Sequence, residues 1–437
     1  MDLLIAFIVF AATMTVCLVI GWSMAIALFI GLVCFLLTGL HRGFRLKTLL
    51  GMVYAGGRTS FVVLEILILI GFLTALWRAS GTISFFVYYG ISIITPHMFI
   101  VITFLITLIL SFALGTSFGI AGTAGVMLMV LARSGGVSQI VTAGAIMSGA
   151  YFGDRCSPAS SSASLVAAVS FTNLYTNVKM MLKTGAIPTL ITLAVYMVLS
   201  YQNPIQVVDQ NMLTELNTSF DLSWPVVIPA VAMLVLPLFR VRVRYAMMAS
   251  ILAAFILTLF VQDAGFAETL KTCIFGYNAN AGLLGEILSG GGLMSMVEVV
   301  LIVLISCTYS GVFNGTGMLI PIQERLGSIA GKIGLLPAQV VLSFLSTGVF
   351  CNQTVATILN AQILGNVYEA KGASHEELAI DMENSVITIA GIVPWSIACT
   401  VPLGILGVGP EAIPYGVLLY MIPLCYLFTK KIWYKKM

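Results

Sequence analysis

The sequence predicts an all-α polytopic membrane protein that consists of two inverted-topology repeats with broken helices or re-entrant hairpins. Three observations support this fold class: the composition, the length of the apolar segments, and a match between the two halves of the chain. Of the 437 residues, 59% are hydrophobic and 8% are charged, and the mean hydropathy is +1.07. A water-soluble chain of this size needs more polar surface, so lipid is the expected solvent.

Apolar segments follow one another along the whole chain, and many are long enough for a helix to cross about 30 Å of hydrocarbon. Others are short or are interrupted by Gly, Pro, Ser or Thr, so some neighbouring pairs are candidates for re-entrant hairpins. We therefore expect about 11–14 membrane segments, from the apolar stretches 2–20, 22–39, 60–78, 96–114, 118–132, 138–153, 184–200, 224–239, 244–261, 296–313, 336–350, 353–366, 378–400 and 411–429.

Basic residues predict the orientation, because cytoplasmic loops carry an excess of Lys and Arg. Three basic clusters follow the second segment, separate the eighth from the ninth, and close the chain: Arg42, Arg45, Lys47, Arg240, Arg242, Arg244, Lys430, Lys431, Lys435 and Lys436. We therefore expect both termini to be cytoplasmic. The stretch 201–223 contains acidic residues but no Lys or Arg, and is expected to be an external linker. The first segment has no basic leader, which favours an uncleaved span.

The two halves match each other at nearly constant spacing. The matching pairs are Glu65 with Glu298, Ser80-Gly81-Thr82 with Asn314-Gly315-Thr316, Ser111 with Ser346, and Pro158-Ala159-Ser160 with Pro394-Trp395-Ser396, at spacings from 233 to 236 residues. We expect a first repeat at 1–200, a linker at 201–223 and a second repeat at 224–437. An odd number of crossings per half would invert the second copy, an arrangement that places a transport site near the midplane. Coincidental similarity of apolar helices is the alternative.

Glu65 and Glu298 each interrupt an apolar segment. A carboxylate at membrane depth is costly, so it is expected to face a polar cavity. Loss of solvation favours the protonated form, and both residues are therefore candidates for proton coupling. The alternative role is a structural hydrogen bond to a broken helix of the other repeat.

The stretch 144–164 combines small residues with polar ones. Gly153 and Pro158 bracket a predicted helix break, since proline cannot donate a backbone hydrogen bond and clashes with the preceding turn. Freed carbonyl oxygens and the hydroxyl groups of Ser160, Ser161, Ser162 and Ser164 would form an oxygen-rich pocket for a hard cation such as Na+. Asp154 is a candidate ionisable group of the same site. The alternative is a packing seam in which the serines bond back to their own helix.

Uncharged polar residues mark equivalent positions in the two halves, and these are further candidate ligands: Thr116 and Ser117 in the first half, and Asn352, Gln353 and Thr354 in the second. Interhelical hydrogen bonds are their alternative use.

Arg155 would bind a substrate carboxylate in a bidentate manner, or would pair with Asp154 or Glu383 inside the bundle.

The segment Gly144-Ala145-Ile146-Met147-Ser148-Gly149-Ala150-Tyr151-Phe152-Gly153-Asp154-Arg155-Cys156-Ser157-Pro158 resembles the signature of the NhaC family of sodium/proton antiporters, in the ion transporter superfamily. Further similarity lies in Gly115-Thr116-Ser117-Phe118-Gly119-Ile120-Ala121-Gly122-Thr123, in Met382-Glu383-Asn384-Ser385 and in Val393-Pro394-Trp395-Ser396. The resemblance implies a bacterial inner-membrane antiporter that couples Na+ or H+ to exchange. It also adds Glu383, Asn384 and Ser396 to the candidate site, with Na+ near Ser160, Ser161 and Asn384.

Two residues depart from the family pattern. Ser161 stands where sodium/proton members typically have aspartate, and Asn384 replaces the aspartate of the second-half motif. The loss of two acids is compatible with an exchanger of amino acids or small carboxylates without Na+ coupling, which is the alternative function.

We expect alternating access about a midplane site between broken helices near 115–124, 148–164, 351–357 and 383–400. A channel is disfavoured because the polar breaks are confined to paired positions. The eight cysteines form no C-x-x-C pair, and Gly115-Thr116-Ser117-Phe118-Gly119 lacks the strand that a hydrolase elbow requires. We therefore expect no enzyme, no cofactor other than the coupling ions and no nucleic-acid partner. The expected partners are the bilayer and a small solute, and a homodimer is left open.

Overall fold

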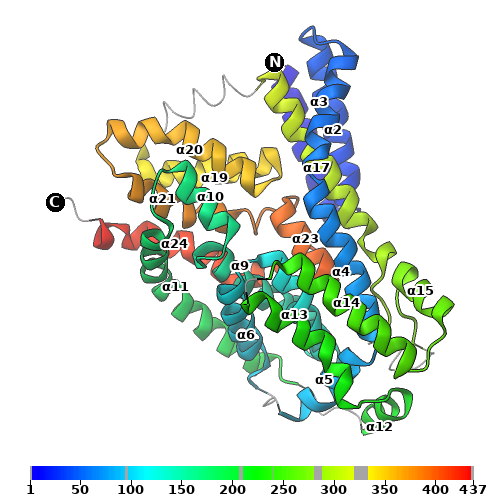
Figure 1. The fold of residues 1–437 in the computed structure, drawn as a ribbon. Coiled ribbons are helices and arrows are strands. Elements are labelled where there is room, and N and C mark those ends of the chain that lie inside the picture. The colour runs from blue at the N-terminus through cyan, green and yellow to red at the C-terminus, as the bar shows by residue number, and fades with distance from the viewer. Residues whose placement is uncertain are drawn as a thin grey trace.

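The computed structural model describes residues 2–93, 97–205, 210–239, 241–279, 288–318 and 333–434, and these are mainly helical (Figure 1). The first half contains α1 (Asp2–Ile20), α2 (Met24–His41), α3 (Leu46–Arg58), α4 (Phe61–Ala79), α5 (Thr82–Ile93), α6 (Phe99–Leu114), α7 (Ser117–Ile120), a π-helical turn (Ala121–Gly125), α8 (Val126–Ser134), α9 (Gln139–Cys156), α10 (Ser161–Val169) and α11 (Leu174–Gln202). Arg240, Lys435 and Lys436, used above to predict the orientation, lie outside the described residues.

The second half follows a short helix, α12 (Gln210–Ser219), which lies in the predicted linker 201–223. Its helices are α13 (Ile228–Leu238), α14 (Val243–Phe260), α15 (Phe266–Phe275), α17 (Val297–Thr316), α19 (Leu335–Phe350), α20 (Gln353–Ala370), α21 (His375–Glu383), α22 (Val386–Ile389), α23 (Ile397–Leu406) and α24 (Val417–Trp433). Within the described ranges, strand-like pairing is confined to an isolated bridge between Tyr277 and Gly290.

Several helices are suited to a bilayer. Five are long and apolar enough to cross it, namely Met24–His41, Ser117–Ser134, Leu174–Gln202, Val243–Phe260 and Leu293–Thr316. Leu46–Arg58 and Val63–Ala79 are bent by 48° against each other and make either one broken span or a re-entrant loop. Shorter apolar helices occur at Leu3–Cys17, Phe99–Leu114, Trp224–Pro237, Leu335–Phe350 and Ile397–Leu406. The predicted all-α polytopic fold is thus confirmed, whereas the inverted orientation of the halves and their boundaries stay predictions.

α2, α3 and α17 form an upright bundle on one side of the molecule in Figure 1. α3 and α17 approach each other closely because glycines lie at their crossing. A methyl group added at Gly311 would lie 2.1 Å from the carbonyl oxygen of Met52, and one at Gly56 would lie 2.6 Å from that of Cys307. Small residues of this kind allow membrane helices to pack backbone to backbone.

α9 is buried along most of its length and packs against α6 and α24. Its glycines fit against α6: a methyl group at Gly149 would lie 2.0 Å from Oγ1 of Thr107, and one at Gly153 would lie 2.0 Å from the carbonyl carbon of Ser111. This seam was the packing alternative for the stretch 144–164. It holds the C-terminal end of α9, which carries Asp154 and Arg155, in the interior of the protein.

Candidate functional site

Four helices of the two halves begin directly after a break in the chain. Thr116, Ser160, Asn352 and Ser396 are the N-cap residues of α7, α10, α20 and α23, and each accepts a hydrogen bond from a backbone N–H of the first turn. Such caps satisfy N–H groups that a helix leaves without a partner. Asn352 follows Thr116 by 236 residues, and Ser396 follows Ser160 by the same number. Predicted site residues therefore build equivalent breaks in both halves.

The residues before two of these caps share an unusual backbone conformation. Gly115 has φ of 67° and Cys351 has φ of 56°, both in the left-handed region. Glycine adopts this region readily, whereas a residue with a Cβ atom is strained there. The agreement between Gly115 and Cys351, which are also 236 residues apart, is what a duplication of the chain predicts.

Within each half, the two breaks touch each other. In the first half, a methyl group at Gly115 would lie 2.5 Å from the carbonyl carbon of Ala159 and from the nitrogen of Ser160. In the second half, the N–H of Ile397 donates to the carbonyl oxygen of Cys351 at 2.8 Å. Each half thus contributes one crossing of two interrupted helices.

Asp154 joins the two crossings. Its carboxylate is 5% exposed and accepts hydrogen bonds from Ser162 Oγ at 3.1 Å to both oxygens, from Ser160 Oγ at 3.4 Å, and from Gln353 Nε2 at 3.3 Å. Ser160 and Ser162 belong to the start of α10, and Gln353 is the first residue of α20. The carboxylate therefore lies at the N-terminal ends of one helix from each half, where the helix dipole favours negative charge.

Arg155 is fully buried beside Asp154 in the chain and faces different partners. Its Nε and Nη2 donate to Oδ1 of Asn384 at 3.1 and 2.6 Å, and Nη2 also donates to the carbonyl oxygen of Met181 at 2.8 Å and to Thr184 Oγ1 at 3.0 Å. All these partners are neutral. Nη1 has no hydrogen-bond partner among the described residues.

Glu383 is the carboxylate that remains without a partner. It ends α21, is fully buried, and neither of its oxygens has a hydrogen-bond partner in the described part of the chain. It directly precedes Asn384, whose Oδ1 accepts from Arg155. Hydrogen bonds or adjacency in the chain thus join seven residues near the breaks, and we call them the central cluster: Asp154, Arg155, Ser160, Ser162, Gln353, Glu383 and Asn384. A buried, unpaired carboxylate is unfavourable unless a cation or a proton neutralises it.

Other predicted site residues lie outside this cluster. Ser161 and Thr354 are exposed, and each lies in the first turn of its helix, α10 or α20. Ser117 is buried at the start of α7. The Na+ ligands expected near Ser160, Ser161 and Asn384 are therefore divided: Ser160 lies at Asp154, Asn384 lies at Arg155, and Ser161 belongs to neither group.

The two proton-coupling candidates occupy different surroundings. Glu65 is paired with Arg244 at 3.1 Å, and the side chain of Glu65 is 46% exposed. Glu298 lines a cavity of about 490 Å³ between the α1–α2 turn, α17 and α23, to which Glu411 and Pro394 also contribute. Glu298 thus lines a cavity together with Glu411, whereas Glu65 lies in a surface ion pair. Their coupling roles stay predictions.

Sequence reasoning missed two sets of contacts. Thr184 gives no signal in an apolar segment, since threonine commonly bonds to its own helix there. Asp381 is fully buried and accepts hydrogen bonds from Tyr368 at 2.6 Å, from Tyr426 at 2.9 Å and from Lys430. The sequence pattern places Lys430 in a cytoplasmic basic cluster and gives no signal that Lys430 contacts Asp381.

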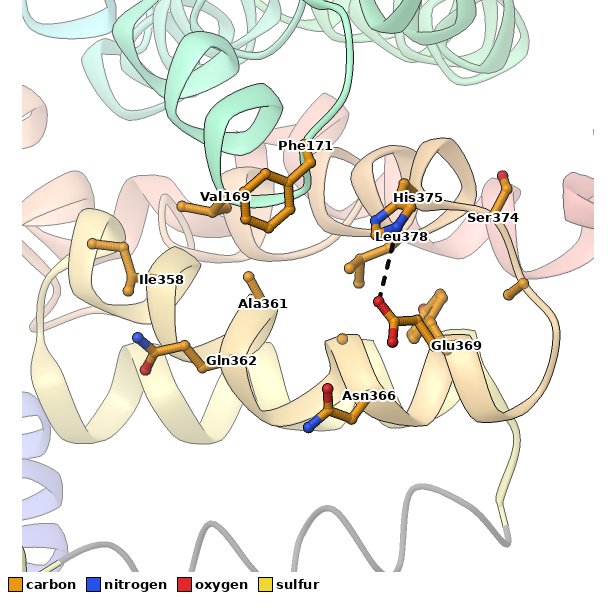
Figure 2. A pocket seen from close by; sticks show the side chains of 13 residues that line it. Val169, Phe171, Ile358, Ala361, Gln362, Asn366, Glu369, Ser374, His375 and Leu378 are labelled. Atoms are coloured by element: carbon orange, nitrogen blue, oxygen red, sulfur yellow. Dashed lines mark ion pairs between the residues drawn. The ribbon is translucent and has the colours of Figure 1, made fainter.

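A second cavity, of about 350 Å³, lies at the far ends of the helices that carry the caps (Figure 2). α20 forms its floor, and the end of α10 and the start of α21 close it with Phe171 and His375, whose Nε2 lies 3.8 Å from Oε1 of Glu369. Since α10 and α20 run from the central cluster to this cavity, a displacement of either helix changes its shape.

Comparison with known proteins gives a consistent result. The sequence profile described as the Na+/H+ antiporter family matches residues 3–165 and 149–429. The chain is 27% identical to the malate-2H+/Na+-lactate antiporter of Bacillus subtilis, over 94% of this chain and 90% of that protein. It is 29% identical to an uncharacterized Na+/H+ antiporter of Haemophilus influenzae, with coverage of 81% and 79%. It is 27% identical to the Na+/H+ antiporter NhaC of Alkalihalophilus pseudofirmus, with coverage of 82% and 79%. The predicted resemblance is confirmed, and the chain belongs to the NhaC-type Na+/H+ antiporter family.

Proposed function

We propose that this antiporter exchanges Na+ for H+ by alternating access, and that both ions use the central cluster. The single observation that carries this assignment is Glu383, a fully buried carboxylate without a hydrogen-bond partner among the described residues. Carboxylate, hydroxyl and amide oxygens are the ligands that hard cations prefer. Asp154, Ser162 and Gln353 supply such oxygens close to the same breaks.

Competition between the two ions follows from the burial of the acids. An ionised carboxylate in a low-dielectric interior requires a positive charge, and either a bound Na+ or a proton supplies it. Because the breaks of both halves meet at Asp154, movement of one half against the other would open the cluster to alternate sides. Binding of Na+ or a proton to the cluster would then permit this movement, whereas the empty cluster, which keeps its negative charge, would oppose it.

The test is proton flux driven by a Na+ gradient in proteoliposomes. Glu383→Gln and Asp154→Asn should each reduce the flux at least tenfold, because each removes a charge that the cation needs. Glu376→Gln is a matched control, since Glu376 is an exposed residue of the same helix, α21, and should leave the flux unchanged. Wild-type flux in Glu383→Gln would sink the assignment of this site.

A proton-coupling role for Glu298 and Glu65 is also part of the proposal. Glu298→Gln should lower the rate or change its pH dependence, because Glu298 lines a cavity together with Pro394, which precedes a break. Glu65→Gln should have the smaller effect, since Arg244 already neutralises Glu65 at the surface. Normal transport by both variants would assign these residues to the scaffold.

Exchange of an organic solute is the second candidate function. Ser161 and Asn384 are neutral where family members typically have acids. Nη1 of Arg155 has no hydrogen-bond partner among the described residues, and the relative from Bacillus subtilis is named for malate and lactate. Counterflow of labelled malate, lactate and amino acids distinguishes this function. Na+-dependent proton flux without any organic solute supports the first candidate.

We further propose that the protein lies in a bacterial inner membrane with both termini in the cytoplasm, and a homodimer is the assembly to be tested. Reporter fusions at each terminus test the orientation. A periplasmic signal from the C-terminal fusion would contradict the orientation that Lys430 and Lys431 predict. Light scattering of the purified protein in detergent tests the dimer.

A further inference from the structure

The number of buried charges at the breaks is small enough to be counted. Five residues with charged side chains are buried among the described residues: Arg78, Asp154, Arg155, Asp381 and Glu383. Lys430 pairs with Asp381 and also with Glu377, at 2.7 Å, away from the central cluster. Arg78 lies in the last turn of α4 and donates to the carbonyl oxygen of Thr74 in its own helix at 2.7 Å. The charges of the central cluster are therefore two carboxylates and one guanidinium.

Arg155 is held in the cluster by hydrogen bonds to neutral acceptors and not by an ion pair. Two of its nitrogen atoms are bound by the neutral oxygen of Asn384, and α11 supplies two more neutral acceptors. A methyl group at Gly185 would lie 2.8 Å from Nη1, so α11 also packs closely against the guanidinium. These contacts fix the guanidinium in place. Its positive charge therefore remains in the cluster and offsets part of the charge of the two carboxylates.

We infer that Arg155 and Asn384 set the charge stoichiometry of the exchange, so that one Na+ is exchanged for one proton and no net charge crosses the membrane. With Asp154 and Glu383 ionised, the empty cluster carries one net negative charge. One Na+ or one proton neutralises it. In one half-cycle Na+ is carried across, and in the other a proton is carried on a carboxyl group and is released on the opposite side. This inference rests on the proposed Na+/H+ exchange.

The first test is the response of the exchange to membrane potential. Proteoliposomes loaded with ²²Na+ are clamped with K+ and valinomycin at zero and at about 100 mV of either sign. Electroneutral exchange predicts the same final Na+ distribution in all cases. One uncompensated charge per cycle would instead change the equilibrium Na+ ratio by about 50-fold, from roughly 2.3 kcal/mol per charge at this potential. Such a change would overturn the inference, whereas absence of any Na+/H+ exchange would overturn the proposed function itself.

The second test adds one acid to the cluster. Asn384→Asp adds a second acid that can carry a proton, whereas the number of Na+ bound stays at one. Two protons are then exchanged for one Na+, one net charge crosses per cycle, and the exchange should depend on membrane potential. Asn366→Asp is the matched control, because it makes the same substitution at an exposed position of α20, and should stay electroneutral. Thermal unfolding of both variants checks that they are folded. A folded Asn384→Asp variant that transports at the wild-type rate and ignores the potential would contradict the role of this position.

Discussion

Asp154 and Glu383, the two acids of the central cluster, have different surroundings. Asp154 lies at the starts of α10 and α20 and receives hydrogen bonds from Ser162 and Gln353, so its charge is stabilised by groups that the fold already provides. Glu383 lies at the end of α21, where the helix dipole disfavours negative charge, and the described residues offer it no hydrogen bond. The two acids therefore differ in how strongly they depend on a bound cation or proton. The hydrogen bonds stabilise the charge of Asp154 without one, whereas the charge of Glu383 requires one.

At the residue scale, Gly115→Ala should lower both stability and transport. The added methyl group would occupy left-handed backbone and would lie 2.5 Å from Ala159 and Ser160, which forces the two breaks apart. We expect a loss of about 1 kcal/mol from backbone strain and a further 1–3 kcal/mol from the clash. Gly372→Ala is the control, since Gly372 has φ of 70° but open space around it, and should lose only the first part. Thermal unfolding in detergent measures both, and equal losses would contradict the close contact.

Short helices are the elements on which the site depends, and they are held by side chains rather than by their own length. α21 has nine residues and carries Glu383, and Asp381 in the same helix is bound by Tyr368 from α20 and by Tyr426 and Lys430 from α24. An isolated helix of this length is unstable. The buried polar contacts of Asp381 therefore fix the helix, and with it the position of Glu383 relative to Arg155.

Lys430→Met tests this role of α24. Removal of the ammonium group would leave Asp381 buried without its positive partner, at a cost of about 3 kcal/mol, and should also weaken the apparent affinity for Na+ because α21 is less firmly held. Lys431→Met changes an exposed neighbour and should have little effect on either quantity. If the two variants unfold at the same temperature and bind Na+ equally well, α24 does not fix α21.

At the crossing of α3 and α17, Gly311→Ala should destabilise the upright bundle by about 1–3 kcal/mol. The methyl group would lie 2.1 Å from a carbonyl oxygen of α3, and backbone cannot move aside as a flexible side chain can. Gly365→Ala, at a helical position with no atom within 4 Å of the added methyl group, should be neutral or stabilising. Denaturation curves of the two variants provide the comparison, and a neutral Gly311→Ala would mean that the helices are further apart.

At the scale of the whole molecule, Na+ should raise the midpoint of thermal unfolding, and the rise should increase with pH. A ligand present at 100 times its dissociation constant stabilises the folded state by about 2.7 kcal/mol. Protons compete for the same carboxylates, so their removal at higher pH favours Na+ binding and enlarges the shift. Choline at equal ionic strength is the control for salt effects, and Glu383→Gln should lose the shift. A shift that is the same at every pH would argue against a shared site.

How far the sequence predicts the molecule depends on the distance between the residues involved. The all-α polytopic fold and the breaks at 115–124 and 351–357 follow from local composition, and Asp154 meets Ser160 and Ser162 because few residues separate them around Pro158. Contacts across the chain are harder to predict. The rotation of α10 after its break decides that Ser162 and not Ser161 faces Asp154, and no pattern in the sequence encodes that angle.

The pairing of breaks within each half also bears on how such a carrier changes its cargo during evolution. Gly115 meets Ser160 through backbone, and Ile397 is joined to Cys351 by a backbone hydrogen bond, so these joints persist when side chains change. Substitutions at positions such as Asn384 therefore change the side chains of the proposed site and leave these backbone contacts in place.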